Sequence, residues 1–129
     1  MKRPLFVYGS LMQGEELNGY LAGLSPRPAK TRGVLYRLPA GYPSLVPSHT
    51  DAWVQGELVS LASMARFQVL DMVEGVGRGL YKREKISIEI EGKSLQAWAY
   101  VMNDAQVKAL GGRPIPSGDW RVVSRATRR

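Results

Sequence analysis

The sequence of 129 residues contains no cysteine and a single histidine, His49. The lack of cysteine excludes disulfide bonds, thiolate metal sites and cysteine nucleophiles. With one histidine, a histidine-rich metal site is excluded, and any Ser-His-Asp arrangement would depend on His49 alone. His49 lies in a polar loop bounded by prolines, where we expect an exposed side chain. The sequence therefore predicts no metal site and no cofactor.

Long hydrophobic runs are also lacking. The longest run near the start, Leu5 to Tyr8, is too short for a signal-peptide core or a membrane span. We therefore expect no membrane association and a cytoplasmic location. With 44% hydrophobic and 22% charged residues, the composition is that of a folded globular protein. The length fits one domain, which we assign to residues 1–123, followed by a basic tail at 124–129.

The net charge of +7 comes largely from one end of the sequence. Four of the eighteen basic residues, all arginines, lie in the last nine positions. The others are scattered, and none forms the basic stripe with interleaved aromatic residues that is typical of nucleic-acid binding. We interpret the charge as a solvated surface with a basic tail, which argues against a nucleic-acid partner. Association through the tail stays an alternative, and it would show a steep dependence on salt.

Hydrophobic spacing predicts more strands than helices. Apolar residues alternate with polar ones in 86–91 and again in 95–101, with Gly92 between them, which predicts an antiparallel hairpin. Further strands are expected at residues 4–8, 31–38 and 53–61, and helical spacing occurs at residues 12–24 and 62–73. Gly56, inside a strand, indicates a bulge or a close backbone approach. This pattern predicts an α+β domain with a mostly antiparallel, curled sheet.

A glycine turn, Tyr8-Gly9-Ser10-Leu11, follows the first strand directly. Successive backbone N–H groups in such a turn can form a concave anion site. Gly9 and Gly14 have phosphate-loop spacing, but two glutamates stand where that loop requires lysine and serine or threonine. The flanks of Ser10 do not match a nucleophile elbow. A substrate carboxylate is a suitable ligand, although the turn by itself is more typical of a plain strand-to-helix connection.

Glu74 is the second candidate for chemistry. At about 100° per residue, it projects between Phe67 and Leu70 on the apolar side of the predicted helix. Burial, the negative end of the helix dipole and the nearby charge of Asp71 would each raise the pKa of Glu74. A glutamate with a pKa near neutrality can accept a proton and return it. A helix-end glutamate before glycine is also typical of a solvated terminus. Glu57, inside a strand, is expected on a solvent face.

Together these segments resemble the γ-glutamylcyclotransferase-like family, which includes the γ-glutamylamine cyclotransferases. The resemblance spans about Leu5 to Val123. It rests on the order and spacing of five short motifs: Phe6-Val7-Tyr8-Gly9-Ser10-Leu11, Gly41-Tyr42-Pro43, Leu70-Asp71-Met72-Val73-Glu74-Gly75, Tyr81-Lys82-Arg83 and Ser117-Gly118-Asp119-Trp120.

The resemblance implies an α+β fold, with a small mixed, mostly antiparallel barrel-like sheet, two principal helices and one pocket. It implies that the Tyr8, Gly9, Ser10 and Leu11 turn holds the carboxylate end of a γ-glutamyl group. Glu74 would be the acid/base residue, and Tyr81 would lie near the pocket.

The implied reaction is cyclisation of a γ-glutamyl amine, amide or peptide to 5-oxoproline with release of the amine, as in glutathione or γ-glutamylamine metabolism. It requires no cofactor. The implied partner is a small γ-glutamyl substrate, and we expect a monomer or a homodimer. The alternative is a non-catalytic protein that binds a γ-glutamyl compound or carboxylate in the same pocket.

Overall fold

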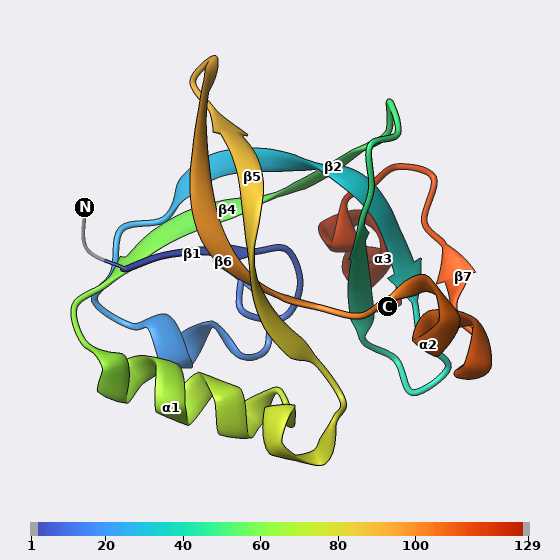
Figure 1. Cartoon of the computed structure of the whole chain (residues 1–129), viewed down its shortest axis with the longest axis horizontal. Helices are drawn as coiled ribbons and strands as arrows, with labels where there is room; N and C mark the ends of the chain where they lie inside the picture. Colours follow the sequence, from blue (N-terminus) through green and yellow to red (C-terminus); the bar gives the residue numbers. More distant parts are fainter. Residues whose placement is uncertain (1–2, 128–129) are drawn as a thin grey trace.

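The computed structural model describes residues 3–127, which form a curled sheet with helices around it (Figure 1). The strands are β1 (Arg3–Val7), β2 (Arg27–Arg37), β3 (Pro43–Pro47), β4 (Trp53–Leu61), β5 (Lys82–Ile90), β6 (Lys93–Val101) and β7 (Arg113–Pro114). The helices are η1 (Asn18–Leu21, 3-10), α1 (Met64–Val73), η2 (Val76–Arg78, 3-10), α2 (Asp104–Ala109) and α3 (Trp120–Thr127).

The sheet closes into a barrel through two parallel contacts. Its strand order is β1-β4-β2-β3-β6-β5, and β6 also pairs with β1. The pairs β1–β4, β4–β2 and β2–β3 are antiparallel, whereas β3–β6 and β6–β1 are parallel and meet at Leu45↔Val101 and Leu5↔Trp98. The other two strands extend this ring: β5 pairs with β6, and β7 pairs with β2. The predicted α+β class with a mixed barrel-like sheet is confirmed.

The β5–β6 hairpin forms as its alternating sequence predicts. Ile86, Ile88 and Ile90 are buried, and the register pairs Ile90 with Lys93. The two residues between them, Glu91 and Gly92, have φ angles of 50° and 75°. Positive φ at both central residues is the geometry of a two-residue hairpin turn that follows the twist of the strands.

Gly56 in β4 marks the close approach that its position indicates. A Cβ atom there would lie 2.3 Å from the carbonyl oxygen of Val7 and 2.6 Å from the ring of Phe6. Only glycine lets β1 pack this closely against β4. Because β1 leads directly into the Tyr8–Leu11 turn, this packing also fixes where the turn begins.

Residues 12–24 do not form the helix that their spacing predicts. The structure has only the short η1 there, within a series of tight turns. Gly14 and Gly23 adopt φ angles of 83° and 84°, which a continuous helix does not allow. The glycines of this segment therefore override the spacing of its apolar residues.

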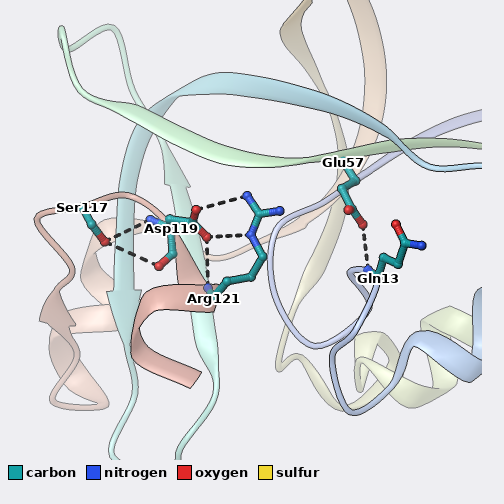
Figure 2. Close-up of polar contacts among 5 residues, drawn as sticks. All are labelled: Gln13, Glu57, Ser117, Asp119 and Arg121. Carbon is teal, nitrogen blue, oxygen red and sulfur yellow. Dashed lines mark hydrogen bonds and ion pairs between the residues drawn. The ribbon is translucent and has the colours of Figure 1, made fainter. Parts of the chain in front are cut away.

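The helices also differ in number and extent from the prediction. The described residues contain three α-helices rather than two. In α3, Asp119 accepts a hydrogen bond from the backbone N–H of Arg121 at 3.0 Å, which caps the helix start (Figure 2). The helix runs to Thr127, so residues 124–127 of the predicted tail are helical, and 128–129 lie outside the described residues. In residues 3–127, no helix has the length and apolar character needed to cross a membrane.

Candidate active site

The site is a cavity of about 860 Å³ beside the barrel. Its walls come from the turn after β1, the start of β3, the end of α1 with the residues that follow it, and α3. The six site residues predicted from the sequence all line this cavity: Tyr8, Gly9, Ser10, Leu11, Glu74 and Tyr81. Segments up to 73 positions apart in the sequence thus converge on one space.

In the Tyr8–Leu11 turn, carbonyl groups accept hydrogen bonds from the described part of the protein, whereas two backbone N–H groups donate none to it and can bind a ligand. The carbonyl of Gly9 accepts from Met12 N at 3.0 Å, and that of Ser10 accepts from Leu17 N at 2.7 Å. The carbonyl of Leu11 accepts from Asn18 Nδ2 at 3.0 Å. Within residues 3–127, the N–H groups of Ser10 and Leu11 donate no hydrogen bond. Two adjacent free donors on a cavity wall are suited to a carboxylate or another small anion.

The turn also depends on the absence of a side chain at Gly9. A Cβ atom at this position would lie 2.5 Å from Cγ of Pro43, at the start of β3. The backbone of the turn therefore packs against Pro43, which also lines the cavity. Glycine is required here by space, because its φ is not among the positive values found elsewhere in the chain.

Glu74 lies where α1 ends. Its N–H completes the helix by donating to the carbonyl of Leu70 at 2.8 Å, and Gly75, with φ of 68°, turns the chain away. Phe67 and Leu70 form the buried side of α1, whereas Met72 is 77% exposed. Glu74, which is half-buried, lines the cavity. Burial raises the pKa of Glu74 to about 7.

Asp71 has a different role from the one expected. Its carboxylate accepts hydrogen bonds from Arg83 Nε at 2.9 Å and from the hydroxyl of Tyr100 at 2.7 Å. The negative charge of Asp71 is balanced by its ion pair with Arg83. Burial, and not the charge of Asp71, therefore accounts for the raised pKa of Glu74. The Asp71 contacts join α1 to β5 and β6, and so hold the end of the helix against the barrel.

Tyr8, Tyr81 and Tyr100 line the same cavity as Glu74, and the charge of Glu74 acts on all three phenols. The hydroxyl of Tyr8 donates to the carbonyl of Tyr100 at 2.5 Å, and the hydroxyl of Tyr81 donates to the carbonyl of Pro43. Burial, and to a smaller extent the charge of Glu74, raise the pKa of both phenols. Both remain protonated at neutral pH, so their hydrogens hold the backbone and their oxygens can accept a hydrogen bond.

Several lining residues were not singled out from the sequence. The sequence motifs imply no site role for Arg78, Tyr100, Trp120 or Ser124, yet all four line the cavity. The prediction for Glu57 is wrong, because this side chain is buried and accepts a hydrogen bond from Gln13 N at 2.8 Å. The sequence does contain an indication that Glu57 is buried. The apolar residues of β4 do not alternate strictly, which is typical of a strand covered on both faces.

The raised pKa of Glu74 has a consequence for stability. The folded-state pKa of about 7 exceeds the ordinary value of 4.5, so the folded protein binds more protons between these values. The free energy of unfolding is therefore expected to fall as the pH rises from 4.5 to 7. Urea unfolding of wild type and Glu74→Gln at about pH 5 and about pH 8 isolates this contribution. An equal pH dependence in both proteins would contradict a buried, proton-binding Glu74.

Residues 3–127 contain no group of three or more histidine, cysteine or acidic side chains arranged to hold a metal ion. The polar groups of the cavity wall include backbone amides, phenols, serine hydroxyls, carboxyl groups and one guanidinium. This set can hold an anion and move a proton.

The fold and the site define a family. Residues 5–122 match the family model described as Gamma-glutamyl cyclotransferase, AIG2-like, and the chain belongs to this family. The resemblance drawn from the sequence motifs is thereby confirmed. One curated relative, the gamma-L-glutamyl-butirosin B gamma-glutamyl cyclotransferase of Niallia circulans, is 32% identical over 103 residues. That match covers 77% of this chain and 66% of the relative, so the chain spans just under two thirds of the relative's length.

Solved structures have the same fold. YkqA from Bacillus subtilis superposes with a TM-score of 0.73 at 27% identity, over 99% of this chain and 44% of YkqA. An AIG2-like protein from Mus musculus gives a TM-score of 0.65 at 17% identity, over 78% of this chain and 76% of that protein. At this lower identity the likeness concerns the fold alone.

Proposed function

We propose that this protein is a γ-glutamyl cyclotransferase that converts a γ-glutamyl amine, amide or peptide to 5-oxoproline and frees the amine. One observation carries the proposal: a glutamate with a pKa of about 7 shares a cavity with a turn whose amides are available. Family membership and the name of the Niallia circulans relative support the reaction class.

Substrate binding is assigned to the turn. The amides of Ser10 and Leu11 would donate to the α-carboxylate of the γ-glutamyl group, with Tyr8 and Gly9 completing the wall. Tyr81 would lie beside the substrate, its hydroxyl oxygen free to accept from the α-ammonium group. Binding the chain in a folded conformation brings the α-nitrogen to the γ-carbonyl carbon, and such intramolecular placement is a large source of rate enhancement.

Proton transfer is assigned to Glu74. Its carboxylate takes a proton from the α-ammonium group, and the freed amine attacks the γ-carbonyl carbon to close the five-membered ring. As the bond to the leaving amine breaks, Glu74 returns this proton to the leaving nitrogen. The second proton that the ring nitrogen loses passes to the released amine, which departs as an ammonium ion. The carboxyl group ends in its starting state, so no co-reactant is consumed. A pKa of about 7 provides both protonation states near neutral pH, which this two-way role requires.

A substrate panel tests the proposal. Wild-type protein is incubated with a γ-glutamyl amine, a γ-glutamyl amide and a γ-glutamyl dipeptide, and 5-oxoproline is measured by chromatography. We expect 5-oxoproline and the free amine in equal amounts from at least one of them. Thermal stabilisation by these compounds without any product would contradict catalysis and favour the non-catalytic binding protein.

A further inference from the structure

Glu57 is a buried acidic residue outside the cavity wall. It lies in β4, paired with Val7 at the end of β1, and its side chain is 7% exposed. A buried carboxylate is costly unless hydrogen bonds or an opposite charge compensate for its lost hydration. What compensates Glu57 therefore indicates what it does.

One partner is the segment that follows the substrate-binding turn. Glu57 Oε1 accepts from the backbone N–H of Gln13 at 2.8 Å (Figure 2). Gln13 comes two residues after Leu11, and Met12 N donates back to the carbonyl of Gly9. The hydrogen bond from Gln13 N to Glu57 thus acts on the same tight turn that presents the amides of Ser10 and Leu11.

The charge of Glu57 is opposed by Arg121 of α3. The guanidinium of Arg121 forms hydrogen bonds with Asp119 at 3.0 and 3.1 Å. These bonds raise the pKa of Arg121, and the charges of Glu57 and Glu15 raise it further. Figure 2 shows the Arg121 guanidinium between Asp119 and Glu57, with hydrogen bonds drawn to Asp119 and none to Glu57, whose carboxylate is bonded to Gln13 N.

We infer that Glu57 is a positioning residue, which holds the Tyr8–Leu11 turn through Gln13 in the conformation that binds the substrate carboxylate. This inference rests on the proposed function. The feature that matters is an oxygen acceptor at the distance of the glutamate side chain, rather than its negative charge. The turn would bind the substrate and the transition state alike, so its loosening affects KM more than kcat.

Two substitutions at Glu57 separate the effect of the position of the acceptor oxygen from the effect of the negative charge. Glu57→Gln keeps an oxygen acceptor at the same distance and loses the charge. Glu57→Asp keeps the charge and draws the oxygen back by one methylene. We expect Glu57→Gln to have a KM within about threefold of wild type, and Glu57→Asp to raise KM about tenfold or more with little change in kcat. Glu89→Asp, in β5 outside the cavity, is the matched control and should leave both constants unchanged.

Amide hydrogen exchange gives a readout that does not require activity. We expect the Gln13 amide to be protected in wild type and Glu57→Gln, and to exchange at least about tenfold faster in Glu57→Asp. The pH profile should keep its midpoint in every variant, because Glu74 is unaltered.

The opposite ranking, with Glu57→Asp like wild type and Glu57→Gln impaired, would overturn the inference, since it would assign the effect to charge. Unchanged constants in both variants, or equal losses in both, would also overturn it. If wild type forms no 5-oxoproline, the proposed function fails, whereas the exchange measurement still decides whether Glu57 holds the turn.

Discussion

Replacing Glu74 by glutamine is expected to lower kcat/KM for 5-oxoproline formation about a thousandfold. Glutamine has nearly the same size and can still form hydrogen bonds, but it cannot accept a proton from the α-ammonium group or return one to the leaving amine. Substrate binding through the turn amides does not involve this side chain, so KM should change little. The loss should therefore lie almost wholly in kcat, measured by initial rates of product release.

Glu16→Gln provides the matched control, because Glu16 also lines the cavity but is exposed and has no part in the proposed reaction. It should retain activity within about threefold. The Glu74→Gln protein should also be folded and at least as stable as wild type above pH 7, since it no longer buries a charged carboxylate. Undiminished turnover by Glu74→Gln would remove Glu74 from the mechanism.

Gly9→Ala is the substitution in the turn with the largest expected effect. The added methyl group would lie 2.5 Å from Cγ of Pro43, so the turn or the start of β3 must move. Pro43 cannot move easily, because it is buried and its carbonyl accepts a hydrogen bond from the hydroxyl of Tyr81. A displacement of about 1 Å at a substrate-positioning group costs on the order of a hundredfold in rate. We expect a fall of that size in kcat/KM, with stability lowered by about 1–3 kcal/mol.

Gly19→Ala makes the same chemical change ten positions further along. No atom lies within 4 Å of its added methyl group, and Gly19 has no positive φ. Its activity should match wild type, which separates crowding against Pro43 from a general effect of losing glycine. Full activity in Gly9→Ala would mean that the turn backbone does not position the substrate.

Much of the candidate site could be predicted because its parts are local. The glycine turn directly follows an apolar strand, and the spacing of Phe67, Leu70 and Glu74 predicts a carboxyl group on the apolar side of the helix. Both features depend on a few consecutive residues with strong conformational preferences. The hairpin of β5 and β6 could also be predicted, because alternating apolar residues and a glycine turn specify it.

The remaining features depend on contacts between distant segments. Barrel closure involves single parallel contacts such as Leu5↔Trp98, for which no local pattern exists. The role of Asp71 depends on Arg83 and Tyr100, which reach it from two other strands. Strand alternation predicts an exposed Glu57, whereas the segment after the Tyr8–Leu11 turn reaches this side chain through Gln13 and the side chain is buried.

The pH dependence of kcat/KM, measured for wild type and Glu74→Gln with the best substrate of the panel, tests the central claim most directly. The free enzyme must hold Glu74 as the carboxylate to accept the first proton, so the profile should rise with pH through a midpoint of about 7. The residual kcat/KM of Glu74→Gln should not show this rise with pH. A wild-type profile that is flat between pH 5 and 8, or a rise that persists in Glu74→Gln, would contradict the account.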